Sequence, residues 1–466
     1  MEQTQESDIV VIGCGAGGAT AAQFAKKNDR KAQVTIFESG SYAQYSKCGI
    51  PYTISGEIPK IMNLLEFTEE WFQKAKINLH LHTKVESIDC KKKIITAEKK
   101  DGSIIKKQYS SLIIATGAQP TRPPIKHIVD ENANKLKKNI FTVRTIDDAK
   151  EISKTLESAK NATVVGAGLI GLEMADTLHK KGLKVTLVEA LPTILTNILD
   201  EDMSKSVLKK IEEEITVYLN TFATEITTDS QGNLKSVLIN EKEKNETKEI
   251  PTDILIIAAG IKPEISLAES IGCKIGVTGS IKVNERSQTS IDDIYAVGDC
   301  TEYVDFVTGK PVPIGLGSIA VRQGIAAGIN ATGGNYQLPE GVLQTATSDF
   351  FNIEIGSVGP CSKLREDMQT VNAKHSGFSK PEYFPGGKPI TMKIIVDLKT
   401  GIIIGAQAVG ENAAQRVNTY ATAILSKLNI DTFKKLETAY APPIAPTLDV
   451  VTLIADVASL KWHRSK

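Results

Sequence analysis

The chain has 466 residues, enough for several domains, because a single hydrophobic core stops growing at roughly 250 to 300 residues. Hydrophobic residues make up 41% and charged residues 24%, values that exclude disordered, collagen-like and coiled-coil proteins. Its 55 basic residues balance 55 acidic ones, so the chain has no overall field for nucleic acid or an anionic membrane. Any anionic ligand must therefore be held locally.

The N-terminal segment, the apolar runs and the cysteines bear on the cellular compartment in which the protein works. The polar start MEQTQES lacks the basic residues and the apolar core of a signal peptide. Apolar runs such as 254–261 are far shorter than the roughly 20 residues of a membrane helix. The six cysteines contain no CxxC pair, which argues against a disulfide framework and a metal site. We therefore expect a cytoplasmic protein without membrane or metal.

The first predicted elements form a nucleotide-binding pattern. A Val/Ile run at 8–12 leads into a glycine cluster, then an apolar-periodic helix, and QVTIFES ends in an acid. Gly13, Gly15 and Gly18 form GxGxxG, which allows a tight turn, close approach to a pyrophosphate and close helix packing. Glu38 can accept hydrogen bonds from a ribose. The alternative is a glycine-rich structural turn.

A second copy of this pattern begins at ATVVGAG. Gly166, Gly168 and Gly171 repeat the glycine spacing, and Glu189 repeats the terminal acid. A carboxylate at this place suits a free 2′-hydroxyl and repels a 2′-phosphate, so NADH is favoured over NADPH. Two dinucleotide sites imply that electrons pass between two carriers. The alternative is that one copy is a vestigial fold element.

Further strand-like runs lie at 111–118, 253–260 and 294–299. The last ends in Asp299, whose carboxylate could bind the ribitol hydroxyls of a flavin, although an Asp before a helix is often an N-cap. The helix-like SIAVRQGIAAGIN follows. From about 336 the pattern changes to the strands ITMKIIVDL and KTGIIIGAQAVG and then to helices through ATAILSKL and DVVTLIADVASL.

These patterns predict an α/β protein with two Rossmann-like dinucleotide-binding domains and a C-terminal α+β domain. We expect a discontinuous FAD-binding domain over 1–145 and 255–335, with an NAD(P)H-binding domain inserted over 146–254. The C-terminal domain would cover 336–466.

Cys48, in YSKCGIPY, has no second cysteine nearby. A flavin takes a hydride from NADH and can pass two electrons to a sulfur against its ring through a thiolate. If a helix begins after Cys48, its N–H groups would favour that thiolate. The oxidised form must then be a mixed disulfide with a small thiol, a persulfide or a sulfenic acid. The alternative for Cys48, and our expectation for Cys14, Cys90, Cys273, Cys300 and Cys361, is a small buried hydrophobe.

Nearly the whole chain resembles the pyridine nucleotide-disulfide reductase family. The matching motifs are GCGAGG, KCGIPY, ATGAQP, VVGAGLIGLEMA, YAVGD, PEYFPG and AYAPP. The resemblance is to the single-cysteine branch, which includes CoA-disulfide reductases, NADH oxidases and peroxidases, and NADH-dependent sulfur or polysulfide reductases. It implies FAD as cofactor and a homodimer formed through the C-terminal domain. It also implies that Thr116, Gly117 and Gly298 join the cofactor-binding residues.

The resemblance also assigns roles near the thiol. The peroxidases and oxidases carry a histidine at the position of Ala16, which counts against oxygen chemistry here. The partner subunit would supply Tyr440 and Tyr383 to serve the leaving thiolate, since a phenol can protonate or hydrogen-bond a departing sulfur. Packing at the dimer seam is the alternative for both. Lys27 and Lys47 could attract an anionic thiol or polysulfide, or they are simply solvated.

The match departs where CoA would be gripped, because Phe24, Gln44 and Lys47 replace a polar residue, a Ser and an Asn. The leading interpretation is therefore an FAD-dependent, NADH-using reductase of a small disulfide, polysulfide or persulfide, acting through Cys48. One alternative is an NADH oxidase that reduces oxygen. Another is an electron-transfer or NADH-sensing flavoprotein in which Cys48 is structural.

Overall fold

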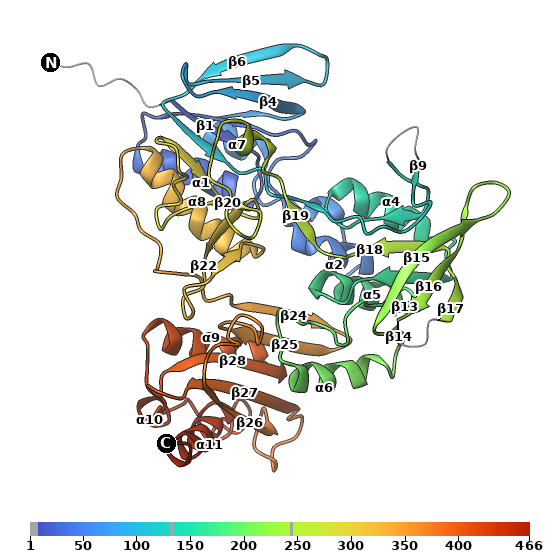
Figure 1. Ribbon diagram of the computed structural model, residues 1–466, viewed down its shortest axis with the longest axis vertical. Coiled ribbons are helices and arrows are strands. Elements are labelled where there is room, and N and C mark those ends of the chain that lie inside the picture. Colours follow the sequence, from blue (N-terminus) through green and yellow to red (C-terminus); the bar gives the residue numbers. More distant parts are fainter. Residues whose placement is uncertain (1–7, 131–134, 243–245) are drawn as a thin grey trace. The chain divides into compact units, whose positions relative to one another are not determined.

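The computed structural model describes residues 8–130, 135–242 and 246–466 (Figure 1). By its contacts the chain divides into two compact units, each built from separate stretches of sequence. The first comprises Met1–Gly49, Pro59–Gln119 and Ile261–Val342. The second comprises Ile50–Ile58, Pro120–Gly260 and Leu343–Lys466.

The first unit is centred on a five-stranded parallel sheet in the order β21-β7-β1-β2-β3. Its strands are β1 (Asp8–Ile12), β2 (Gln33–Phe37), β3 (Ile77–His80), β7 (Ser111–Ile114) and β21 (Ile294–Ala296). Nearly every residue of β1, β2 and β7 is buried. Such near-continuous Val/Ile burial is expected of parallel strands covered on both faces.

Two helices of the first unit, α1 (Ala16–Asn28) and α8 (Gly317–Ala331), cross closely because both are rich in small residues. A Cβ at Gly324 would stand 2.4 Å from the Gly17 carbonyl oxygen, and one at Gly328 would stand 2.3 Å from that of Ala21. Glycine is therefore required at both places.

The remaining elements of the first unit are short. They are η1 (Lys47–Gly49), η2 (Ile61–Leu64), α3 (Glu69–Lys74), β4 (Thr83–Asp89), β5 (Ile94–Lys99), β6 (Ile104–Gln108), β8 (Ala118–Pro120), β19 (Ile261–Pro263), α7 (Ser266–Ser270), β20 (Ile281–Lys282), β22 (Thr301–Val304) and β23 (Pro311–Pro313). They pair as the small sheets β4-β5-β6, β20-β22-β23 and β19-β8.

The second unit repeats the parallel architecture in the order β11-β18-β12-β13-β14. Its strands are β11 (Ile140–Phe141), β12 (Asn161–Val165), β13 (Lys184–Val188), β14 (Thr216–Tyr218) and β18 (Ile254–Ile257). The boundary expected between 254 and 255 falls inside β18, which pairs with β12 and β11. The chain accordingly returns to the first unit only after Gly260.

Helices and further strands complete this half of the second unit. They are α2 (Ile50–Ser55), β9 (Val129–Asp130), β10 (Lys135–Leu136), α4 (Ile146–Leu156), α5 (Leu169–Lys180), α6 (Glu201–Ile211), β15 (Thr221–Thr228), β16 (Leu234–Glu241) and β17 (Glu246–Pro251).

The rest of the second unit is an antiparallel sheet in the order β24-β25-β28-β27-β26. Its elements are β24 (Ala346–Phe350), β25 (Ile353–Val358), β26 (Thr370–Phe378), β27 (Pro389–Asp397), β28 (Ile403–Gly410), α9 (Ala413–Leu425), α10 (Ile430–Phe433) and α11 (Val450–Arg464). Helix α9 packs on β25 and β28, and α11 packs on β26 and β27. This part of the chain has the α+β architecture expected for the C-terminal domain.

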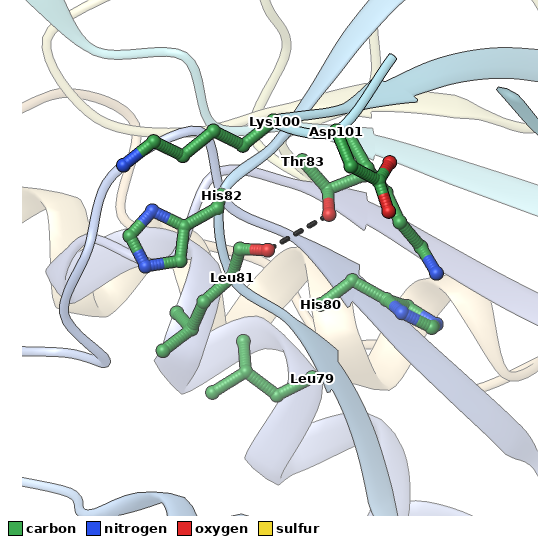
Figure 2. A pocket seen from close by; sticks show the side chains of 8 residues that line it. Leu79, His80, Leu81, His82, Thr83, Lys100 and Asp101 are labelled. Carbon is green, nitrogen blue, oxygen red and sulfur yellow. Dashed lines mark hydrogen bonds between the residues drawn. The ribbon is translucent and has the colours of Figure 1, made fainter. Parts of the chain in front are cut away.

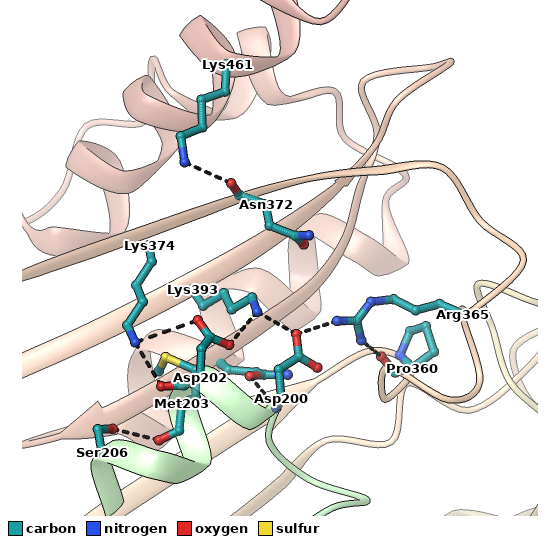
Figure 3. A network of polar contacts seen from close by, with 11 residues as sticks. Asp200, Asp202, Met203, Ser206, Pro360, Arg365, Asn372, Lys374, Lys393 and Lys461 are labelled. Atoms are coloured by element: carbon teal, nitrogen blue, oxygen red, sulfur yellow. Dashed lines mark hydrogen bonds and ion pairs between the residues drawn. The ribbon is translucent and has the colours of Figure 1, made fainter.

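A charged network joins α6 to this antiparallel sheet (Figure 3). Asp200, buried just before α6, is ion-paired with Arg365 and, at 2.8 Å, with Lys393 on β27. Lys393 also lies 2.6 Å from Asp202. Burial opposes ionisation of Asp200, but these two cations hold the pKa of its carboxyl below the ordinary value.

Within the described ranges, no helix combines the length and the apolar character needed to cross a bilayer.

Candidate functional site

The carboxyl edge of the first parallel sheet gathers most of the residues predicted to bind a flavin nucleotide. Gly13 follows β1, Glu38 follows β2, Thr116 follows β7 and Asp299 follows β21. These four strands are neighbours in one parallel sheet, so their carboxyl ends meet at the same edge. Ligands of open α/β sheets bind at this edge.

The first glycine turn has the geometry that a pyrophosphate requires. Gly13 has φ +100°, and a Cβ there would stand 2.3 Å from the Ala115 carbonyl oxygen. A Cβ at Gly18 would stand 2.1 Å from the Gly13 carbonyl oxygen. At Gly15, by contrast, a Cβ would meet no atom of the described chain within 4 Å. The turn is closed at Gly13 and Gly18 and open at Gly15, the N-cap of α1, and a helix N-terminus is a favourable place for an anion.

The second glycine turn repeats each of these features. Gly166 has φ +104°, and its Cβ would stand 2.4 Å from the Ala258 carbonyl oxygen. A Cβ at Gly171 would stand 1.9 Å from the Gly166 carbonyl oxygen. Gly168, the N-cap of α5, faces space that the described residues leave open within 4 Å. Both turns therefore fit a dinucleotide.

The two predicted ribose-binding acids are held in matching positions. The Cys14 N–H donates to Glu38 Oε2 at 2.7 Å, and the Gly40 N–H donates to Oε1 at 2.6 Å. Glu189 accepts in the same way from Ala167 at 2.6 Å and Leu191 at 2.8 Å. Each carboxylate thus braces its glycine turn. Because an ionised carboxylate has about four acceptor positions, each can still bind ribose hydroxyls.

Two further turns lie at the carboxyl edge of the first sheet, one after β7 and one after β21. The Thr116 hydroxyl donates to the Glu264 carbonyl at 2.6 Å, and Gly117 has φ +69°. Gly298 has φ +79°, and β22 rather than a helix follows Asp299. An N-cap role therefore does not account for Asp299.

Gln323 is a supporting residue that the sequence patterns did not single out. It is fully buried on α8, and its Oε1 accepts from the Gly298 N–H at 2.8 Å and from the Thr301 hydroxyl at 3.1 Å. These bonds fix the turn that carries Asp299. A signal for it was available, since an amide among the small residues of SIAVRQGIAAGIN needs a partner once buried.

Cys48 lies in the short turn η1, and α2 follows directly at Ile50. The expectation of a helix after Cys48 is confirmed, although that helix has only six residues. Among the six cysteines, all within the described residues, Cys48 is the exposed one. Cys14 sits in the first glycine turn, but burial and then the Glu38 charge raise the pKa of its thiol far above the ordinary value. Cys14 is therefore unsuited to act as a thiolate.

The two predicted phenols lie together in the second unit. Their hydroxyl oxygens are 3.0 Å apart, and Tyr383 and Tyr440 are 72% and 48% exposed. The hydrogen bond with Tyr440 raises the pKa of Tyr383. Both phenols are therefore accessible to a second molecule, as either role at a subunit boundary, service to a leaving thiolate or packing at a dimer seam, requires.

The two predicted substrate lysines differ in their surroundings. Lys27 places its ammonium 4.4 Å from the centroid of the Phe24 ring, a cation–π contact on the last turn of α1. Lys47 is exposed directly before Cys48. Both cations remain accessible to an anion.

A shallow hollow of about 400 Å³ lies on the first unit, beside the end of β3 (Figure 2). His80 and His82 line it together with Lys100 and Asp101. Burial, and then the charge of Lys99, lower the pKa of His80, so this imidazole is neutral near pH 7. None of the predicted site residues lines this hollow. The nucleotide sites are therefore located by the carboxyl ends of the parallel strands and not by this hollow.

Comparison with known proteins supports this arrangement. The family model described as pyridine nucleotide-disulphide oxidoreductase matches residues 7–324, and that of the corresponding dimerisation domain matches 345–450. An NADH oxidase from Methanocaldococcus jannaschii is 36% identical over 459 residues, which cover 97% of this chain and 98% of that protein. An NAD(P)H coenzyme A polysulfide/persulfide reductase from Pyrococcus horikoshii is 32% identical, covering 98% and 99%.

Among solved structures, an NAD-dependent persulfide reductase from A. fulgidus has a TM-score of 0.91 and 34% identity. The match covers 98% of this chain and 84% of that one. The two nucleotide-binding folds and the C-terminal domain are thereby confirmed. The chain belongs to the pyridine nucleotide-disulphide oxidoreductase family, whose members use FAD together with NADH or NADPH.

Proposed function

We propose that this protein is an FAD-dependent NADH oxidoreductase that reduces a small disulfide, polysulfide or persulfide through Cys48. The observation that carries the proposal is an exposed cysteine, on a turn that leads directly into a helix, in a chain with two glycine turns shaped for a dinucleotide. The relatives named as persulfide and polysulfide reductases support the same substrate class.

Each cofactor has a set of residues proposed to hold it. FAD would lie on Gly13, Gly15 and Gly18, with its ribose on Glu38, its ribitol on Asp299, and Thr116, Gly117 and Gly298 alongside. NADH would lie on Gly166, Gly168 and Gly171, with its ribose on Glu189. When bound, FAD supplies the transfer of two electrons from NADH to sulfur.

The chain's own chemistry begins with the Cys48 thiolate. It attacks one sulfur of the substrate, so a bond from Cys48 Sγ to that sulfur forms while the substrate S–S bond breaks and the second sulfur leaves as a thiolate. Lys47 and Lys27 would attract an anionic substrate. A phenol of Tyr440 or Tyr383 from a partner subunit would hydrogen-bond the departing sulfur, and the raised pKa of Tyr383 keeps that phenol protonated at neutral pH.

The phenols connect this proposal to a homodimer. Residues 345–450 match the family's dimerisation domain, and both phenols are exposed on the unit that contains it. We expect two copies of the chain to associate through this region, so that each copy supplies its phenols to the other.

An NADH oxidase is the second candidate, because the relative from Methanocaldococcus jannaschii carries that name. In the first glycine turn Ala16 supplies no imidazole for oxygen chemistry. The oxidase interpretation predicts oxygen consumption that does not depend on Cys48.

The test is an acceptor panel with the FAD-loaded enzyme and NADH. CoA disulfide, glutathione disulfide, cystine, polysulfide and oxygen are compared in the wild type, Cys48→Ser and the control Cys361→Ser. We expect Cys48→Ser to lose at least about 100-fold in kcat with one sulfur acceptor, while Cys361→Ser retains wild-type turnover. Wild-type rates with every sulfur acceptor in FAD-containing Cys48→Ser would end the proposal.

A further inference from the structure

The turn that carries Cys48 is continuous with α2, and α2 is attached to a helix of the nucleotide-binding sheet. Cys48 is the middle residue of η1 (Lys47–Gly49), and α2 starts at the next residue, Ile50. By its contacts Cys48 belongs to the first unit and α2 to the second, so the covalent chain through Gly49 and Ile50 is what links the thiol to α2. Within the second unit, α2 packs against α5.

The first attachment is a buried hydrogen bond. The hydroxyl of Thr177, on α5, donates to the Pro51 carbonyl oxygen at 3.2 Å. Thr177 is 3% exposed and Pro51 is buried, so a buried polar group would be left without this partner if the bond were lost. Pro51 is three residues after Cys48 in sequence, and this bond holds the first turn of α2.

The second attachment is an ion-pair bridge at the other end of α2. Lys180 lies 2.9 Å from Glu57, just after α2, and 2.9 Å from Asp176 on its own helix. The Asp176 side chain is only 7% exposed, so it needs the Lys180 cation. Burial disfavours the charge on Lys180, but the two carboxylates raise its pKa well above the ordinary value. The bridge is therefore intact at neutral pH.

Helix α5 is a rigid support for these two attachments. It begins at Leu169, directly after its N-cap Gly168 in the second glycine turn, and packs on β12 and β13. It is also bonded to β24, because the Ser348 hydroxyl donates to Glu173 Oε1 at 2.6 Å. A side chain that must meet a reacting atom within fractions of an ångström is best held from such an element.

We infer that Thr177, and Lys180 together with Glu57, are positioning residues that fix α2 and thereby the place of Cys48. This rests on the proposed redox function of Cys48. These residues hold α2, and the chain from α2 leads to Cys48. Loss of either attachment would therefore let the Cys48 thiol move away from the place where it reacts with the substrate sulfur. Reduction of sulfur acceptors then slows, whereas reactions that do not use the thiol continue.

The test uses the FAD-loaded full chain with three variants and two controls. Thr177→Val removes the hydroxyl at constant shape, while Glu57→Gln and Lys180→Met break the bridge. Lys180→Arg retains the cation. Lys205→Met is the matched control, since it removes an exposed ion pair with Glu201 on α6 of the same unit.

Three functional quantities are measured for each protein, and the melting temperature is measured beside them. The functional quantities are turnover with the sulfur acceptor from the panel, turnover with ferricyanide, and the long-wavelength thiolate-to-flavin absorption after addition of NADH. Ferricyanide takes electrons without the thiol, so it reports on NADH and flavin alone. Melting temperature identifies any variant that is merely less folded.

For Thr177→Val and Glu57→Gln we expect kcat with the sulfur acceptor to fall about three- to tenfold and the absorption band to weaken. Ferricyanide turnover should stay within about twofold of wild type. Lys180→Met should behave in the same way, and Lys180→Arg and Lys205→Met should match the wild type.

Wild-type band and sulfur turnover in both Thr177→Val and Glu57→Gln would overturn the inference, even if Lys180→Met unfolds. A wild-type enzyme with no band, whose turnover survives Cys48→Ser, would overturn the proposed function and this inference with it. The two failures are therefore distinguishable.

Discussion

At the scale of single residues, the two acids after β2 and β13 combine a structural and a binding task. Glu38 and Glu189 each accept two backbone N–H bonds, one from the glycine turn and one from the loop after the strand. The remaining acceptor positions are available to a ribose. A carboxylate in this place also repels a 2′-phosphate, which connects the geometry to nucleotide choice.

Replacing Glu189 by Gln should therefore change nucleotide preference. The amide loses the negative charge and one of the two acceptor oxygens, and hydrogen bonds to charged groups contribute about 1.5–3 kcal/mol. We expect kcat/KM for NADH to fall about tenfold and the ratio of NADH to NADPH activity to narrow by a similar factor. Steady-state kinetics with both nucleotides measure this.

Glu38→Gln is the matched control for that experiment, because it makes the same chemical change in the other glycine turn. It should weaken retention of FAD and leave the ratio of NADH to NADPH activity unchanged. If the ratio moves with Glu38 and not with Glu189, our assignment of the two nucleotides to the two turns is reversed.

At the scale of elements, the crossing of α1 and α8 depends on glycine in a way that is open to measurement. In Gly324→Ala the new Cβ meets the Gly17 carbonyl oxygen, which belongs to a helix backbone and cannot move aside. Overpacking of this kind costs about 1–3 kcal/mol, and the better helix propensity of Ala returns at most about 1. We expect a net loss of about 1–2 kcal/mol in the free energy of unfolding.

Gly317→Ala on the same helix is the comparison. A Cβ at Gly317 meets no atom of the described chain within 4 Å, so the substitution should leave stability unchanged or raise it by up to about 1 kcal/mol. Chemical denaturation of both variants measures the two values. Equal effects would mean that helix propensity, and not the crossing, governs these positions.

Sequence patterns predicted what is encoded locally. The spacing of Gly13, Gly15 and Gly18 and the acid at Glu38 are read within one βαβ unit, and the structure has the elements expected there. Long-range pairing could not be read in this way. The apolar run 254–257 would suit a buried strand of either parallel sheet. Only its pairing with β12 shows that it belongs to the sheet of the second unit. The need for glycine at 324 is likewise set by a backbone about 300 residues earlier.

The site shows the same division. Cys48 and the two phenols were identified by their motifs, and the structure adds that Tyr383 and Tyr440 share a hydrogen bond across 57 residues of sequence. The positions of Thr177 and Lys180 carry no motif, because their importance comes from what α5 touches. Assignment of catalytic and cofactor roles to all of these residues remains a prediction.

At the scale of the whole molecule, acidic and basic residues are equal in number, so the net charge is zero. The electrostatic contribution to stability therefore depends on local arrangements of charge. Two such arrangements join elements of the second unit. One is the network of Asp200 with Arg365 and Lys393, between α6 and the antiparallel sheet. The other is the set of contacts that Asp431 on α10 makes with α11. Both contain carboxyls whose pKa is lowered in the folded protein.

Acid should weaken the second arrangement in a defined range of pH. The Ser459 hydroxyl donates to Asp431 at 2.6 Å, His463 lies at 2.8 Å and Lys434 at 3.3 Å. Led by the Ser459 bond, these contacts lower the pKa of Asp431 to about 2, whereas an unfolded Asp has a pKa of about 3.9. Because the folded pKa is the lower one, the stabilisation is complete above about pH 4 and is lost as the pH falls towards 2.

Asp431→Asn tests this, with Asp456→Asn at an exposed position of α11 as control. The Asp431 side chain is 35% exposed, so solvent screens its contacts. Their contribution to the free energy of unfolding should therefore be that of an exposed ion pair, about 0.2–1 kcal/mol. At pH 7 Asp431→Asn should be less stable than the wild type by that amount, and the difference should vanish near pH 2. Urea unfolding at pH 7, 4, 3 and 2 measures it. A difference that persists unchanged at pH 2 would show that the carboxylate charge is not what joins α10 to α11.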